Sequence, residues 1–239
     1  VAATAQFLRQ KGLLTENQEI IDVGCGPGSF VTEFAKTSKH VVGTDISPKM
    51  LEYGAMFAEQ AGRKNVSYVA GDFKQLDLEQ LGWKKRFDLV FSSITPAISG
   101  MDGIERMMEI CRGYCYNTVV IYREDDLLQE IREEVFGIRE KNQAKFNSQW
   151  FYALFNMMYL RGYYSETSYY HETYHGTWAS AEEAARDYAP LLRRITGDEQ
   201  AEEKIVEYIR KKYSDGRSLS YEEKTIYGCL LWDLRENHL

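Results

Sequence analysis

The chain has 239 residues, 44% of them hydrophobic and 27% charged, with a formal net charge of -7 and a pI near 5.3. A chain of this length can bury one substantial core, and its negative charge disfavours a large nucleic-acid substrate because phosphates would be repelled. No stretch approaches the roughly 18 apolar residues of a membrane span, and no signal peptide is visible.

The first predicted elements are a helix over residues 2–11 and an apolar strand near 19–23. Because the chain starts abruptly in the helix, we expect a few native residues upstream. The strand runs into the turn Asp22-Val23-Gly24-Cys25-Gly26-Pro27-Gly28. Glycines adopt positive φ and carry no Cβ, so this turn can bend sharply and let a ligand approach the backbone. The helix that follows aims free N–H groups at the same place.

The spacing of the glycines separates ligand classes. A dinucleotide-binding loop would place its third small residue at Ser29, and no Gly-Lys-Ser/Thr follows for a Walker-type phosphate loop. We expect Asp22 to orient the loop through hydrogen bonds, with or without direct ligand contact. Cys25 is interpreted as a small buried spacer rather than a nucleophile.

A second acidic position follows the next predicted strand, residues 40–44. Asp45 lies 21 positions after Gly24, where a carboxylate can accept hydrogen bonds from both hydroxyls of a ribose. The alternative for Asp45 alone is a solvated loop carboxylate. Ser47 and Pro48 are typical of the N-cap and first position of a helix, which is predicted to run to Gly62.

Two further strands carry motifs at their ends. Residues 66–70 lead into Gly71-Asp72-Phe73, and residues 87–92 form the strand that ends in Ser92-Ser93. Taken alone, Asp72 could be an ordinary turn residue, and Asp88 is interpreted as structural because it precedes the strand core. In order, however, the four motifs resemble those of class I S-adenosylmethionine-dependent methyltransferases, over residues 19 to about 123.

The resemblance implies a fold, a cofactor and a binding site. The fold is α/β, a Rossmann-like doubly wound sheet of seven strands, mostly parallel with one antiparallel strand. The cofactor is S-adenosylmethionine and the product S-adenosylhomocysteine. On this resemblance, the glycine turn is expected to pack against the methionine and ribose portions, Asp45 to clamp the ribose, Asp72 to meet the adenine amino group, and Phe73 to line the ring. The predicted cofactor-binding residues are Asp22, Gly24, Cys25, Gly26, Gly28, Asp45, Ile46, Met50, Asp72, Phe73 and Ser92.

The remaining elements are predicted from periodicity and capping signals. A fifth strand is expected near 117–122, an amphipathic helix over 125–142, a helix over 148–160 and a sixth strand over 166–177. A capping box at Ser180 starts another helix, which Pro190 is expected to kink or break. A helix over 198–212 and an antiparallel strand over 225–234 follow. We predict one domain, residues 1–239, with insertions at 142–164 and 179–220 that form a lid selecting the substrate.

Cysteines and histidines give no metal-site pattern. The four cysteines lack a framework spacing, which favours reduced thiols and a cytoplasmic location. Cys111 and Cys115 are predicted to be helical neighbours on a core face. His171 and His175 would lie about 13 Å apart along a strand, too far to share a metal, so we predict none. His171 and Glu124 are the candidates for a general base, if one is needed.

The sequence therefore predicts a cytoplasmic enzyme that methylates a small molecule. The basic runs at 84–86 and 210–212 are interpreted as solvated faces, and the Asn/Asp-Pro-Pro-Tyr/Phe motif of amino-group methyltransferases is absent after the fourth strand, where Thr95-Pro96 stands. We expect no nucleic-acid or membrane partner and a monomer or homodimer. The alternatives are a catalytically silent S-adenosylmethionine-binding module and, less supported, an aminopropyl transferase.

Overall fold

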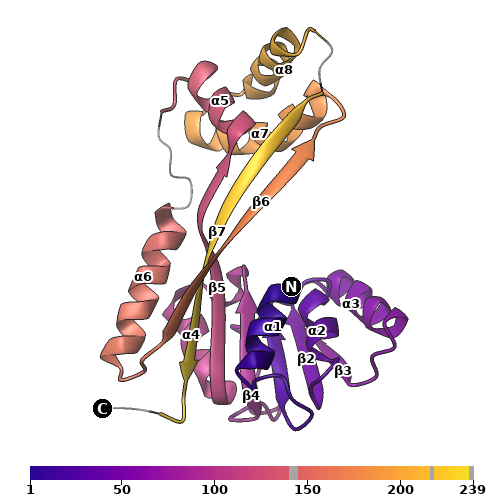
Figure 1. Cartoon of the computed structure of the whole chain (residues 1–239), viewed down its shortest axis with the longest axis vertical. Coiled ribbons are helices and arrows are strands. Elements are labelled where there is room, and N and C mark those ends of the chain that lie inside the picture. Colours follow the sequence, from indigo (N-terminus) through magenta and orange to yellow (C-terminus); the bar gives the residue numbers. More distant parts are fainter. Residues whose placement is uncertain (140–144, 216–217, 237–239) are drawn as a thin grey trace. The chain divides into compact units, whose positions relative to one another are not determined.

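The strands form a single sheet in the computed structural model, which describes residues 1–139, 145–215 and 218–236 (Figure 1). The strand order is β3-β2-β1-β4-β5-β7-β6. The strands are β1 (Glu19–Val23), β2 (His40–Asp45), β3 (Val66–Ala70), β4 (Phe87–Ser93), β5 (Cys111–Asp125), β6 (Glu166–Thr177) and β7 (Ser220–Asp233). The predicted seven-stranded sheet is thus confirmed.

Helices connect the strands in the alternating pattern expected of a doubly wound sheet. They are α1 (Ala2–Gln10), α2 (Ser29–Phe34), α3 (Pro48–Gln60), the 3₁₀ turn η1 (Pro96–Ile98), α4 (Gly100–Ile110), α5 (Asp126–Glu134), α6 (Lys145–Leu160), α7 (Ala181–Thr196) and α8 (Ala201–Lys212). Among the helices in the described ranges, none has the length and apolarity needed to cross a membrane.

The sheet is mostly parallel. Strand β1 pairs in parallel with β2 and β4, β2 with β3, and β4 with β5. Strand β7 runs the other way: the Leu234 N–H donates to the Gly113 carbonyl at 2.8 Å, while Thr118 lies opposite Cys229. After β3 the chain crosses back to place β4 beside β1, so a topological switch point lies between β1 and β4.

The chain divides into two compact units. The first comprises Val1–Val119, Phe151–Ser168 and Gly228–Leu239, and the second comprises Val120–Trp150 and Tyr169–Tyr227. The described residues of the predicted insertion at 179–220 belong to the second unit, whereas 151–164 of the other predicted insertion belong to the first. That these segments act as a lid stays a prediction.

Local signals in the first unit produced the expected elements. The Ser47 side chain caps α3 by accepting from the Met50 N–H, Pro48 occupies the first helical position, and Gly62 takes φ +69° after the helix. Strand residues such as Ile21 and Val90 are completely buried. The core of this unit therefore holds β1 and β4 rigidly against their neighbours.

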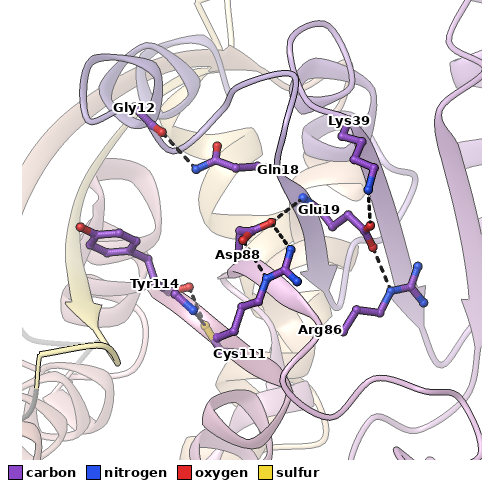
Figure 2. Close-up of polar contacts among 10 residues, drawn as sticks. Gly12, Gln18, Glu19, Lys39, Arg86, Asp88, Cys111 and Tyr114 are labelled. Atoms are coloured by element: carbon purple, nitrogen blue, oxygen red, sulfur yellow. Dashed lines mark hydrogen bonds and ion pairs between the residues drawn. The ribbon is translucent and has the colours of Figure 1, made fainter.

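A charged network crosses the amino ends of the strands (Figure 2). The Glu19 carboxylate receives Lys39 Nζ at 2.9 Å and Arg86 Nε at 3.0 Å. Asp88 accepts from the Glu19 N–H at 2.9 Å and pairs with the Arg112 guanidinium at 2.8 Å. Asp88 therefore ties β4 to β1, in agreement with the structural role predicted for it.

The second unit has its own helical core. Buried side chains of α5, α7 and α8 form one apolar cluster that includes Ile131, Leu192 and Ile205. Asp125 caps α5 by accepting from the Leu128 N–H at 2.8 Å, and its other oxygen accepts from the Tyr188 hydroxyl at 2.8 Å. This buried carboxylate links two of the three helices.

Two predicted elements were wrong in extent or type. Cys111 and Cys115 lie in β5, not on a helix, and β5 begins six residues earlier than the predicted strand at 117. The segment is rich in aromatic and β-branched residues, and its start pairs with β4 through Phe87 opposite Cys111. The helix predicted over 125–142 ends at Glu134, and Gly137 takes φ +68°; residues 140–142 lie outside the described part.

Smaller corrections concern the last third of the chain. Helix α7 runs through Pro190 without a break, because Ala189 and Leu192 on either side are buried in the apolar cluster and fix the helix by packing. Strand β7 begins at Ser220 rather than 225, and α8 begins at Ala201 rather than 198. Boundaries of this kind depend on tertiary contacts more than on local propensity.

Candidate functional site

The carboxyl ends of the first four strands surround one cavity of about 470 Å³. It lies within the first unit, beside the switch point between β1 and β4, where open α/β sheets bind ligands. The lining residues are the last two of β2 and residues that follow β1, β2, β3 and β4, namely Gly24, Thr44, Asp45, Ile46, Gly71, Asp72, Phe73, Lys74, Thr95, Pro96, Ala97 and Ser99.

The glycine turn after β1 forms one wall of the cavity. The N–H groups of Gly24 and Cys25 donate to the Thr44 carbonyl at 2.8 and 3.0 Å, which holds the turn against β2. Gly24 has φ +72°, and a Cβ there would lie 2.0 Å from the Thr95 Oγ1. Gly26 has φ +52° with nothing within 4 Å of its would-be Cβ. The backbone at Gly26 is therefore open to a ligand.

Asp45 holds the turn from the next strand. Its Oδ2 accepts from the Gly26 N–H at 2.9 Å, and its Oδ1 accepts from the Ser47 N–H at 2.9 Å. An ionised carboxylate oxygen has two lone pairs, so each oxygen can still accept one more hydrogen bond. Asp45 thus orients the glycine turn and still presents acceptors to the cavity it lines.

Asp72 and Lys74 form the wall after β3. Asp72 accepts from the Lys74 N–H and from the Gln75 side-chain amide, both at 3.0 Å. Lys74 Nζ donates to the Ser99 carbonyl and lies 3.1 Å from the Asp102 carboxylate. These contacts join the loop after β3 to the start of α4 and close that side of the cavity.

A sequence-family comparison decides the class of this site. Residues 14–172 match the family described as "Methyltransferase domain", which is about two thirds of the chain. The chain belongs to this methyltransferase family. Its domain is of the class I S-adenosylmethionine-dependent methyltransferase type, as the four motifs implied, and S-adenosylmethionine is the cofactor of such domains.

Known proteins with the same domain differ in what they methylate. The chain is 28% identical to a sterol 24-C-methyltransferase of Candida albicans over 138 residues, 55% of this chain and 36% of that protein. It is 24% identical to the human EEF1A lysine methyltransferase 2 over 148 residues, 58% of this chain and 62% of that protein. The chain thus spans between about a third and three fifths of the length of these relatives.

A solved structure matches the fold over almost the whole methyltransferase chain. It is described as a putative methyltransferase of Bacillus halodurans, with a TM-score of 0.57, 20% identity, and coverage of 95% of this chain and 98% of that one. At this identity the likeness concerns the fold. It extends the match beyond residue 172, where the family model ends.

Five of the predicted cofactor-binding residues line the cavity, namely Gly24, Asp45, Ile46, Asp72 and Phe73. Ile46 is 71% exposed and offers its side chain to a ligand. Phe73, by contrast, is 2% exposed, and the Arg106 guanidinium lies 5.7 Å from its ring centroid. The Phe73 ring is therefore engaged in the interior.

Two predicted residues of the glycine turn, Cys25 and Gly28, do not line the cavity. The Cys25 side chain is buried, and burial raises the pKa of its thiol, which fits the predicted spacer better than a nucleophile. Gly28 has φ +75° at the start of α2, and a Cβ there would lie 2.8 Å from the Tyr68 hydroxyl. Gly28 lets α2 approach β3 closely and does not line the cavity.

Ser92 and Met50 do not line the cavity either. Ser92 is completely buried, and its hydroxyl accepts from the Asn117 side chain at 3.1 Å and donates to the Tyr116 carbonyl at 3.4 Å. This makes Ser92 a link between β4 and β5. Met50 lies on α3 and is 41% exposed.

Asp22 lies beneath the glycine turn rather than in its hydrogen-bond network. Its side chain is 2% exposed, and its Oδ2 has no hydrogen-bond partner. Burial, together with the negative charge of Asp45, raises the pKa of Asp22 to about 8. We predicted that Asp22 orients the loop through hydrogen bonds. This prediction was wrong, because the carboxylate that accepts from the loop, at the Gly26 N–H, is that of Asp45.

The segment after β4 was not predicted as part of the site. Ile94 takes φ +52°, a strained conformation for a β-branched residue, and the chain then returns over the glycine turn with Thr95 packed on Gly24. The Thr95 hydroxyl accepts from the Ala97 N–H at 3.2 Å and caps η1, whose first residue is Pro96. A threonine before a proline is a helix-start signal that could have found this segment.

The two candidates for a general base lie in the second unit. His171 is an exposed residue of β6, and Glu124 accepts from the Tyr122 hydroxyl on β5. His175 lies 3.7 Å from the Glu222 carboxylate. In the described ranges, no group of three or more histidine, cysteine or acidic residues is placed to hold a metal ion. A catalytic role for His171 or Glu124 stays a prediction.

Proposed function

We propose that the cavity holds S-adenosylmethionine with its amino-acid tail at the Gly24 and Gly26 backbone, its ribose at Asp45 and its adenine beside Asp72. The open space at Gly26 and the unused lone pairs of Asp45 support this arrangement. Thr95 packs directly on Gly24, so the cavity is closed on that side. The free acceptor capacity of Asp45 therefore fits the ribose hydroxyls, and the open space at Gly26 leaves room for the tail.

The bound cofactor supplies a methyl group that its positively charged sulfur already activates. The chain's own contribution is to hold the reactants in line and to exclude water. The cavity-lining carboxylates Asp45 and Asp72 are both engaged with backbone N–H groups. We therefore assign them to binding rather than to removal of a proton.

We further propose that the methyl acceptor is a small molecule. The supporting observation is that four of the six cations in the two basic runs have carboxylate partners. Lys84 pairs with Glu79 at 3.0 Å and Arg86 pairs with Glu19 at 3.0 Å. In the other run, Arg210 pairs with Glu182, and Lys212 with Glu130. Cations neutralised in this way, in a chain of net charge -7, make a poor surface for nucleic acid.

The second unit is our candidate for selecting the acceptor. Most of it, from residue 173 onward, lies beyond the part matched by the family model. Tyr170 stacks on Tyr227 with ring centroids 4.7 Å apart, and the Tyr227 hydroxyl donates to Glu172 at 2.9 Å. Tyr227 is buried, whereas the Tyr170 ring is partly exposed and Glu172 is exposed, and aromatic faces beside carboxylates can recognise specific small molecules. With four buried free cysteines, we also propose a cytoplasmic location.

Tritiated S-adenosylmethionine tests this proposal directly. The protein is incubated with the labelled cofactor and a cell extract, and the extract is then separated into metabolites, protein and nucleic acid. We expect label in the metabolite fraction and stoichiometric formation of S-adenosylhomocysteine. As a control, the variant Glu59→Gln, which changes an exposed carboxylate on α3, should give the same distribution of label as the wild type.

Each other result has a defined meaning. Label in protein or nucleic acid alone would contradict the small-molecule acceptor. Cofactor binding by calorimetry without product in any fraction would favour the silent binding module. A Tyr227→Phe variant that keeps cofactor affinity but alters the labelled metabolites would support selection by the second unit.

A further inference from the structure

Asp22 occupies an unusual position on β1. It pairs with Gly43 on β2 and Phe91 on β4, and Gly43 in turn pairs with Tyr68 on β3. Since Gly43 has no side chain, neighbouring groups fill the space: a Cβ there would lie 2.8 Å from the Tyr68 ring and 2.9 Å from the Cys25 Sγ. The Asp22 carboxyl therefore lies in a closed, largely apolar environment.

The groups facing Asp22 do not compensate a negative charge. Those that act on it electrostatically in the described structure are Asp45 at the end of β2, Cys25 in the turn and Tyr68 on β3. None of these is a cation, and the Tyr68 hydroxyl is already committed to the Gly54 carbonyl at 2.9 Å. Oδ2 is unpartnered, and burial raises the pKa of Asp22 to about 8, so this environment favours the protonated carboxyl in the free enzyme.

A positive charge in the cavity would change this balance. Gly24, two residues beyond Asp22, and Asp45, its electrostatic neighbour, both line the cavity. An opposite charge held nearby in a medium of low dielectric favours the ionised form of a carboxyl group. S-adenosylmethionine carries a positive sulfur, whereas the sulfur of S-adenosylhomocysteine is neutral. The two ligands should therefore differ in their effect on Asp22.

We propose that Asp22 is a proton-linked selectivity residue: it releases its proton when the positively charged cofactor binds and recovers it when the neutral product takes its place. Preference for cofactor over product then rises with pH. This inference rests on the proposed placement of S-adenosylmethionine in the cavity. It assigns to Asp22 a part in product release that does not require contact with the reacting atoms.

Calorimetry of the wild-type protein measures the proton directly. S-adenosylmethionine is titrated at pH 7 in two buffers of different ionisation enthalpy, and S-adenosylhomocysteine is titrated in the same way. We expect the cofactor to release a substantial fraction of one proton and the product to release clearly less. From pH 6 to pH 9, the ratio of product Kd to cofactor Kd should rise about tenfold, which corresponds to an Asp22 pKa about one unit lower in the cofactor complex than in the product complex.

The variant Asp22→Asn mimics the protonated carboxyl. It should release no proton on cofactor binding, its Kd ratio should stay constant with pH, and its cofactor Kd at pH 6 should stay close to the wild-type value. Its Tm above pH 8 should equal or exceed that of the wild type, because ionisation of a buried acid is removed. Glu52→Gln, at an exposed carboxylate on α3, is the matched control and should keep the wild-type linkage.

Three results would overturn the proposal: cofactor binding to the wild type without proton exchange, equal exchange for cofactor and product, or undiminished exchange in a folded Asp22→Asn protein. If that variant does not fold, the two wild-type titrations decide alone. Failure of the wild type to bind S-adenosylmethionine at all would instead overturn the proposed cofactor site.

Discussion

In the first unit, the carboxylates at the amino ends of the parallel strands have different partners from those at the carboxyl ends. At the amino ends, Glu19 and Asp88 are held by lysine and arginine side chains, as Figure 2 shows. At the carboxyl ends, Asp45 accepts from backbone N–H groups, and Asp22 has an oxygen with no partner. One end neutralises its acids internally, and the other leaves acceptors and charge for a ligand.

Strand β1 shows the contrast within a few residues. Hydrogen bonds from Lys39 and Arg86 lower the pKa of Glu19 to about 2, whereas burial raises the pKa of Asp22 to about 8. Glu19 therefore adds to the free energy of unfolding at neutral pH, while an ionised Asp22 would reduce it. A carboxylate that weakens the fold is understandable where a ligand's charge can compensate it.

The largest expected effect follows from crowding the carboxyl end at Gly24. Gly24→Ala places a Cβ within 2.0 Å of Thr95 at φ +72°, so overlap and strain should together lower stability by about 3 kcal/mol. We expect at least about 100-fold weaker S-adenosylmethionine binding by calorimetry, because the turn must shift.

Gly62→Ala is the control for backbone strain alone. Gly62 has φ +69° with nothing within 4 Å of its would-be Cβ, so this change should cost about 1 kcal/mol of stability without altering cofactor affinity. Equal losses of affinity in the two variants would show that the contact with Thr95 has no importance for the site.

A smaller effect is expected from removing the acceptors of Asp45. Asp45→Ala should weaken cofactor binding by roughly 1 to 3 kcal/mol, because both the turn and the ribose lose their acceptor. Asp77→Ala is matched to it, since the Asp77 side chain also accepts from two backbone N–H groups, those of Glu79 and Gln80, away from the cavity. Unchanged affinity in Asp45→Ala would refute the ribose assignment.

The smallest effect is expected at the amino end. Glu19→Gln should lower the free energy of unfolding by about 1 kcal/mol at pH 7 and leave cofactor affinity unchanged, because its partners are half exposed and lie at the other edge. The Glu19 pKa is lowered from 4.5 to about 2, so its contribution is complete above pH 4.5 and is lost as pH falls toward 2.

Urea unfolding of wild type and Glu19→Gln across pH 2.5 to 7 checks this prediction, with Glu79→Gln, an exposed ion-pair residue, as control. The stability difference should shrink steadily below pH 4.5. A difference that persists at the lowest pH, or a change in cofactor affinity at pH 7, would show that the two ends are not separate in function.

The glycine turn, the acids after β2 and β3 and the cap of α3 could be predicted because each depends on a few consecutive residues. Ser92 could not be placed, since its burial depends on pairing with β5 and on Asn117. Nor could the burial of the Phe73 ring be predicted, since it depends on Arg106 of α4, thirty-three positions later in the chain. Thr95 was overlooked because its role is set by a contact with Gly24, seventy-one positions earlier.

The sequence by itself determined the methyltransferase class, the parallel order of the first strands and the residues whose backbone must bend, because φ preferences and capping are local properties. The tertiary structure decided which acid orients the turn, how far β5 and β7 extend, and which side chains reach the cavity. Strand pairing and burial bring together residues far apart in the chain, and the charge state of Asp22 depends on those neighbours rather than on its own motif.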